Sequence, residues 1–172
     1  MIEQRQTLVD YETQSFFWDR YMTIGKQAFE ERKMIEAVRM FMLALKSAMI
    51  VDDKSQSTQS MSWMALIYYE LGNLTESERL LKQVISMGAD APEIEDKHQH
   101  YKLLALVLEG LGKHKEAQET YIWLLNDSRR RGLSESDAEY RLLVQKHEQA
   151  KAQLAQVRLP ASAAVWDFTA VN

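Results

Sequence analysis

The stretch "YYELGNLTESERLLKQVI", Tyr68 to Ile85, returns forty residues later as "LEGLGKHKEAQETYIWLL", Leu108 to Leu125. Each copy has an apolar run that ends in Leu-Gly, then a glutamate four residues after the glycine, a small residue and a second apolar run. A shift of the sequence by another forty residues aligns a third, earlier block with these two. The chain therefore repeats one structural unit.

Each block predicts two amphipathic helices joined by a tight turn. A small residue on each helix is needed where the two helices cross closely, and large apolar residues at helical spacing fill the rest of the contact. The small residues are Gly25, Ala65 and Ala105 in the first helices and Ala37, Ser77 and Ala117 in the second helices. Gly72 and Gly112 can take the left-handed conformation that ends a helix, and Asn73 with Glu76 forms a capping box. Because one such hairpin cannot bury its apolar face alone, the hairpins are expected to stack.

This pattern resembles the tetratricopeptide repeat. The resemblance rests on the small residue of the first helix, the glycine at the turn, and the series small–x–x–x–large–x–x–apolar in the second helix, and it covers Trp18 to Arg131. The first block departs from the family pattern, with Arg32 in place of the turn glycine and Ala28 where a large aromatic residue is usual. The period of 40 residues exceeds the usual 34 and is similar to the kinesin-light-chain variety. HEAT-like repeats share the period, but they do not require this placement of glycine and small residues.

The resemblance implies an all-α fold, a right-handed α-solenoid of helix-turn-helix repeats. We expect one helical domain over residues 1–157, with seven helices: repeats at about 18–51, 58–91 and 98–131, and a C-terminal capping helix at about 134–157 that starts near Ser134 and Asp137. The segment 158–172 is a tail that contains Trp166 and Phe168. Because a disordered tail normally lacks such apolar residues, we expect it to dock in cis or in trans, either in the groove or as a cap near Leu154.

Composition and charge limit the classes of function. The 172-residue chain has 46% hydrophobic residues, no cysteine and a net charge of −4, which disfavours nucleic acid as a partner. The basic run Arg129 to Arg131 precedes Gly132 and is interpreted as the cationic end of a helix. With no run of about 18 apolar residues and no signal peptide, the sequence predicts a cytoplasmic protein without a membrane span. The nine methionines are interpreted mostly as core residues that fill gaps.

No arrangement of residues argues for an enzyme, a cofactor or a metal. The sequence has no Gly-rich phosphate loop and no Gly-x-Ser-x-Gly elbow, and the absence of cysteine excludes a thiol nucleophile. The segment "EIEDKHQH", Glu93 to His100, is rich in possible metal ligands. On a helix, however, His98 and His100 point about 200° apart and cannot share an ion. The sequence therefore predicts no catalytic, cofactor or metal site.

In tetratricopeptide arrays the first helix of each pair lines a concave face that binds an extended peptide or a helix. Carried over to this chain, the resemblance gives a peptide-binding groove formed by Met22, Lys26 and Phe29, by Ser62, Leu66 and Tyr69, and by Lys102, Leu106 and Glu109. Leu66, Tyr69 and Leu106 would form its apolar centre. The carboxylate clamp of the family is disfavoured, because only Lys26 matches it, whereas Met22, Trp63, Gln99 and Leu103 occupy its other positions.

These features predict an interaction module or adaptor whose partner is another protein. Two alternatives stay open. One is a chaperone of bacterial secretion translocators, a family that also uses three such repeats but with a period nearer the usual length. The other is a scaffold subunit that associates with itself as a homo-oligomer.

Overall fold

The computed structural model describes residues 2–89 and 97–158, and within these ranges it contains helices and turns but no strand. The helices are α1 (Ile2–Glu30), α2 (Met34–Ile50), α3 (Lys54–Glu70), α4 (Leu74–Ala89), α5 (Lys97–Gly110), α6 (His114–Arg130) and α7 (Ala138–Arg158). The predicted all-α fold of paired helices is confirmed. The chain forms two compact units, residues 1–112 with α1 to α5 and residues 113–172 with α6 and α7. Of the predicted tail, 158–172, Arg158 is the last residue of α7, and residues 159–172 lie outside the described residues.

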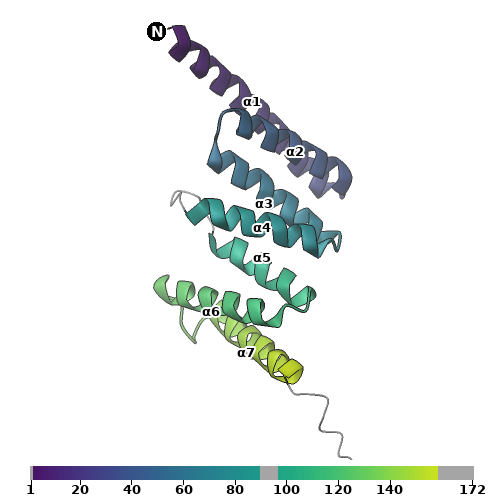
Figure 1. Cartoon of the computed structure of the whole chain (residues 1–172), viewed down its shortest axis with the longest axis vertical. Helices are drawn as coiled ribbons and strands as arrows, with labels where there is room; N and C mark the ends of the chain where they lie inside the picture. Colours follow the sequence, from purple (N-terminus) through teal and green to yellow (C-terminus); the bar gives the residue numbers. More distant parts are fainter. Residues whose placement is uncertain (1, 90–96, 159–172) are drawn as a thin grey trace, which may run out of the picture. The chain divides into compact units, whose positions relative to one another are not determined.

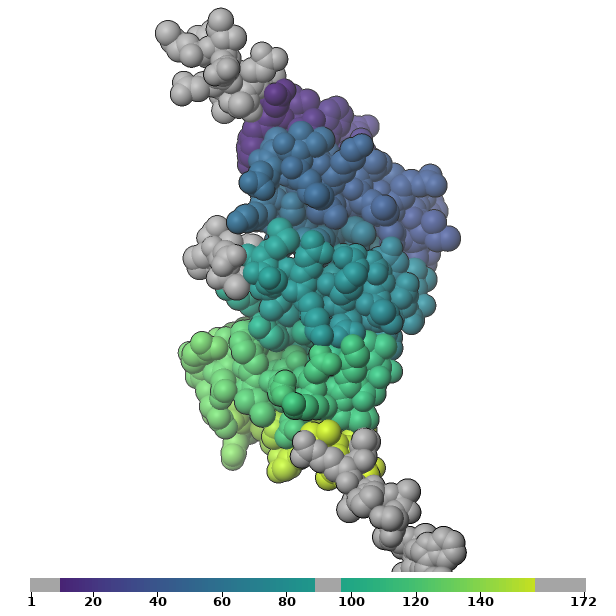
Figure 2. All heavy atoms as spheres, viewed as in Figure 1, coloured from purple at the N-terminus to yellow at the C-terminus, as the bar shows by residue number. Residues whose placement is uncertain are grey.

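In the first unit, each helix packs against the next one along the chain, from α1 to α5 (Figure 1). The first helices of the pairs also contact one another, α1 with α3 and α3 with α5. The space-filling view shows α1 to α4 as adjoining bands that run from purple through blue to teal (Figure 2). This order of contacts is that of an α-solenoid of helical repeats.

The turns inside the repeats share one backbone conformation. Gly72 and Gly112 have φ angles of 76° and 68°, as predicted, and Arg32 takes the same left-handed conformation with a φ of 61°. The N–H groups of Lys33 and Asn73 donate to carbonyls five residues earlier, each at 2.8 Å, which is the longer bond of a Schellman motif. The turn of the first block therefore follows the repeat although its residue does not.

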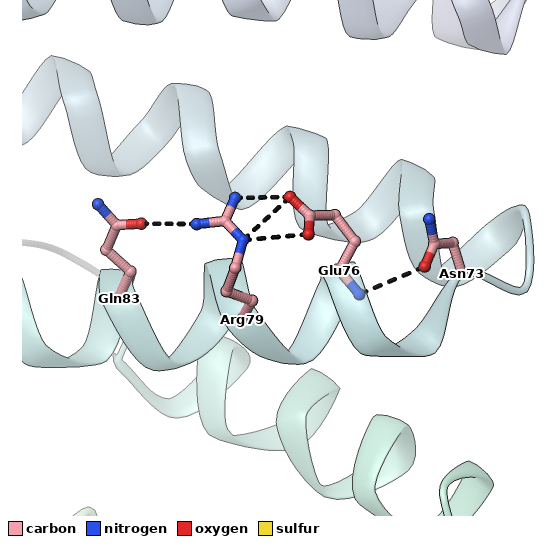
Figure 3. Close-up of polar contacts among 4 residues, drawn as sticks. All are labelled: Asn73, Glu76, Arg79 and Gln83. Atoms are coloured by element: carbon pink, nitrogen blue, oxygen red, sulfur yellow. Dashed lines mark hydrogen bonds and ion pairs between the residues drawn. The ribbon is translucent and has the colours of Figure 1, made fainter.

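Only one half of the predicted capping box at the start of α4 forms, because the Asn73 N–H donates to the Tyr68 carbonyl and not to the Glu76 carboxylate. The Asn73 side chain accepts a hydrogen bond from the Glu76 N–H at 3.3 Å, so it caps the helix. The Glu76 carboxylate binds Arg79 through atoms at 3.0 and 2.6 Å, and Arg79 donates to Gln83 at 3.3 Å (Figure 3). These contacts join the first three turns of α4 along its exposed side.

The close crossing of paired helices involves the small residues that the sequence marks. A Cβ atom on Gly25 would lie 2.8 Å from Cε1 of Phe41, so α1 and α2 meet at this glycine. In the next pair the Ser77 hydroxyl donates to the Ala65 carbonyl at 2.8 Å. Ala65, Ala105 and Ala117 are each 0% exposed, which confirms their predicted burial.

In the second unit α6 packs against α7. Arg129 donates to the Tyr140 hydroxyl at 2.8 Å and lies 5.7 Å from the centre of its ring. The helix α7 begins at Ala138, four residues after the predicted start. The expected pairing of Ser134 with Asp137 is present, because the Ser134 N–H donates to the Asp137 carboxylate at 2.8 Å, as in a capping box. Asp137 also supplies the carbonyl for the helical bond from Arg141.

Candidate functional site: a groove between α3 and α5

A groove of about 540 Å³ lies between α3 and α5 in the first unit. Its lining comes from the first helices of the second and third repeats: Ser62, Trp63, Leu66, Gln99, His100, Lys102, Leu103 and Leu106. Apolar side chains make up half of this set, and Leu106 is 39% exposed. The groove combines an accessible apolar surface with polar groups supplied mainly by α5.

One wall of the groove is fixed by a hydrogen bond between the two helices. The Nε2 atom of His100 lies 2.8 Å from the Ser62 hydroxyl oxygen, and that hydroxyl donates to the Thr58 carbonyl at 2.7 Å. The contact between His100 and Ser62 holds the imidazole against α3.

Aromatic rings extend the groove toward α1. The Trp63 ring stacks on Phe41 at 5.4 Å and meets Phe29 edge-on at 5.6 Å. The Lys26 ammonium lies 5.7 Å from the centre of the Trp63 ring, within the range of a cation–π contact. Trp63 therefore connects the groove to two residues of α1 and to the buried Phe41.

Eight of the nine predicted site residues fall into three groups. Ser62, Leu66, Lys102 and Leu106 line the groove. Lys26 and Phe29 lie beside it through their contacts with Trp63. Tyr69 and Glu109 are half-buried on the same two helices but are not part of its lining.

Met22 differs from the prediction, because it is only 3% exposed. Its sulfur lies 3.7 Å from the Ser60 hydroxyl, so the side chain is enclosed between α1 and α3. A residue buried in this way contributes to the packing of the two helices and has no surface to offer a ligand.

The sequence analysis names Trp63, Gln99 and Leu103 only as positions of the disfavoured carboxylate clamp, and it does not predict His100 as a groove residue, yet all four line the groove. Trp63 immediately follows the predicted Ser62 and lies three residues before Leu66, a spacing that places it beside them on a helix. The sequence indicates His100 only as a possible metal ligand. In the described ranges no group of three or more His, Asp or Glu side chains is placed to hold a metal ion. None of the helices in those ranges has the length and hydropathy that a membrane span requires.

Solved structures with a similar fold come from several proteins. The TPR domain of Arabidopsis FLU aligns with a TM-score of 0.64 and 15% identity, over 68% of this chain and 98% of that one. The TPR2B domain of yeast Sti1, in a complex with pHsp70, aligns with a TM-score of 0.62 and 15% identity, over 80% and 98% of the two chains.

A Podospora anserina putative kinesin light chain with nearly identical TPR-like repeats aligns with a TM-score of 0.65 and 16% identity, over 81% of this chain and 67% of that one. No family model and no curated protein matches the sequence. At these identities the likeness concerns the fold, and the fold of this chain is that of tetratricopeptide-repeat domains.

Proposed function

We propose that the protein is an interaction module that binds a segment of another protein in the groove between α3 and α5. The observation that carries this proposal is the accessible apolar lining formed by Leu66, Leu103 and Leu106 beside the Trp63 ring. Exposed apolar residues gathered in a concave surface mark binding sites more often than isolated ones do. The complex of the Sti1 domain with pHsp70 supports a protein partner for a domain of this fold.

The lining also indicates the chemistry of the bound segment. Its apolar side chains would lie over Leu66 and Leu106, where burial contributes about 25 cal/mol per Å² of apolar surface. Gln99, His100 and Lys102 supply polar groups on the α5 side of the groove. A segment with apolar anchors and polar groups along one edge would match both parts of the lining.

Affinity purification from native lysate tests the proposal. The variant L66D with L106D places two charges in the groove, and it should lose partners that the unmodified protein captures while its helical circular dichroism stays unchanged. The matched control is I35D, because Ile35 is 80% exposed on α2 and lies outside the groove. Equal capture by the groove variant and the unmodified protein would exclude the groove as the site.

Residues 159–172 of the C-terminal tail are part of this proposal although they lie outside the described residues. Its apolar residues suit it to compete for the groove, in cis or in trans, or to cover a helical surface. Deletion of residues 159–172 should tighten partner binding if the tail competes, and should lower the melting temperature without tighter binding if the tail is a cap. A deletion that changes neither quantity would show that the tail docks at neither place.

A further inference from the structure

A second groove, of about 710 Å³, lies on the other side of α3, between α2 and α4. We call it the methionine groove, because five of its lining residues are Met42, Met49, Met61, Met64 and Met87. Its other apolar lining residues are Leu45, Ile50, Tyr68 and Leu80, and its polar ones are Lys46, Asp52, Lys54, Ser57, Glu76, Arg79 and Gln83. Nothing in the function proposed above uses this surface.

The two grooves occupy opposite faces of α3. Met61 and Met64 face the methionine groove, whereas Leu66 faces the groove shared with α5. At about 100° per residue, Leu66 is about 140° from Met61 and about 200° from Met64 around the helix axis. A ligand in one groove therefore does not touch the lining of the other.

The floor and the rim of the methionine groove differ in exposure. Met61, Met64 and Leu80 are 2 to 6% exposed and belong to the core of the first unit. Met49 and Ile50, at the end of α2, are 66% and 59% exposed, and Met42 is 55% exposed. Methionine side chains are unbranched and polarizable, so they adapt to the shape of an apolar partner.

The walls of this groove favour a helix as the ligand. Both walls are helices whose backbone groups are already paired within α2 and α4, so they offer no sheet edge to an extended peptide. An α-helix satisfies its own backbone groups and can place an apolar face against methionine side chains. The lining spans Met42 to Ile50 on α2 and Glu76 to Met87 on α4, which corresponds to about 12 to 17 Å and to about two to three helical turns.

Charge distinguishes the two ends of the methionine groove. Near the start of α4, Glu76 and Arg79 neutralise each other, and Arg79 also binds Gln83 (Figure 3). Lys46 and Lys54, toward the end of α2 and the start of α3, have no ion pair among the described residues. Asp52 is the acidic lining residue at that end, so the two lysines leave an excess of positive charge.

We propose that the methionine groove binds an amphipathic helix of a second protein, which presents aliphatic or aromatic residues at spacings of three and four and carries carboxylates at the end that meets Lys46 and Lys54. The site is separate from the groove between α3 and α5, and the proposal does not depend on the function of that groove. The chain would then hold two partners on opposite faces of one helix.

Three fluorescent 14-residue helical peptides test this proposal with the full-length protein. The first has a Leu/Phe face at positions i, i+3, i+4 and i+7 and two glutamates in its first turn; the second has lysines in place of the glutamates; the third is a scrambled sequence without an apolar face. Binding is followed by fluorescence anisotropy and by the ¹³C-methyl NMR signals of methionine. The first peptide should shift the signals of Met42, Met49, Met61, Met64 and Met87 and leave those of Met22, Met34 and Met40 unchanged.

Substitutions on the rim supply the matched controls. M49E and K54E should each weaken binding of the acidic peptide at least tenfold, and K54E should improve binding of the lysine peptide. I35E, also an exposed apolar position on α2 but outside the groove, should leave binding unchanged. The proposal is wrong if none of the peptides binds, if the three bind equally, or if I35E weakens binding as much as M49E. The methionine signals of the groove could also shift when the protein concentration is raised without any peptide. That result would assign the surface to a second copy of this chain and would overturn the proposal.

Discussion

Gly25 on α1 lies directly against the ring of Phe41 on α2, so close that a Cβ atom would sit 2.8 Å from Cε1 and 3.0 Å from two other ring carbons. Phe41 itself is fully buried. At the equivalent positions of the next repeat the chain has Ala65 and Leu81, a larger residue on the first helix and a smaller one on the second. The two repeats therefore divide a similar volume differently between their helices.

We expect the substitution G25A to destabilise the protein by about 1–3 kcal/mol, because the new methyl group overpacks a site that Phe41 fills. The gain in helix propensity, up to about 1 kcal/mol, offsets only part of this cost. The double variant G25A with F41L copies the combination of the second repeat and should be more stable than the sum of the two single effects predicts. Urea denaturation measures all three, and a G25A protein as stable as the unmodified one would contradict this account of the crossing.

The left-handed Arg32 predicts a stabilising substitution. A non-glycine residue in this conformation destabilises the folded state by about 1–2 kcal/mol, whereas glycine adopts it without this cost. Arg32 also pairs with Glu70 at 3.1 Å, but both side chains are exposed and such pairs contribute about 0–1 kcal/mol. R32G should therefore raise the free energy of unfolding, by about 0.5–1 kcal/mol.

The control for this prediction is R32A, which removes the ion pair but keeps a side chain in the left-handed conformation. It should be no more stable than the unmodified protein. The reverse substitution G72A, at an equivalent turn with a φ of 76°, should destabilise by about 1–2 kcal/mol. Thermal denaturation that ranks R32A above R32G would contradict the argument from backbone conformation.

The contact between Glu76 and Arg79 predicts a dependence of stability on pH. The Arg79 guanidinium holds the pKa of Glu76 below its usual value of 4.5. The contribution of this ion pair to the free energy of unfolding is therefore fully present above about pH 4.5. It is lost as the pH falls through the pKa that Glu76 has in the folded state. At pH 7, E76Q should be less stable than the unmodified protein by about 0.2–1 kcal/mol, because the pair is partly exposed. This difference should shrink below pH 4; a difference that grows on acidification would contradict the assignment.

Met22 should behave as a core residue and not as a groove residue. Removal of a buried methionine side chain costs about 2–5 kcal/mol, so M22A should clearly lower the midpoint of urea denaturation. M22L conserves volume and should cost less than about 1.5 kcal/mol. Among protein that remains folded, both variants should capture partners as the unmodified protein does. Loss of capture by a fully folded M22L variant would restore Met22 to the site.

The repeat could be predicted because the residue type at each of its marked positions is explained by contacts within one hairpin. Glycine at a left-handed turn and small residues at helix crossings follow from backbone and packing rules that hold within one hairpin. How deeply a side chain is buried between two hairpins does not follow from these local rules. Met22 and Ser62 occupy the same place in successive repeats, yet Met22 packs on Ser60 and is buried, whereas Ser62 meets His100 at the wall of a groove. That difference depends on the neighbouring repeat, 38 residues further along the chain.

The methionine groove shows a second limit of sequence interpretation. Met61 and Met64 are core residues, as their spacing predicts. Met42 and Met49 lie on α2, one face of which is buried. Both methionines are on the opposite side of that helix and are exposed. A count of methionines cannot separate these two roles, because both produce apolar residues at helical spacing.

Site-specific photo-crosslinking shows whether the groove between α3 and α5 contacts a protein partner. The photoreactive residue p-benzoylphenylalanine replaces Leu106, which is 39% exposed in the groove, or Leu142, which is 54% exposed on α7 and outside it. Irradiation in native lysate should link position 106, and not position 142, to a partner that the unmodified protein also captures. Adducts with that partner from position 142 and none from position 106 would contradict the account.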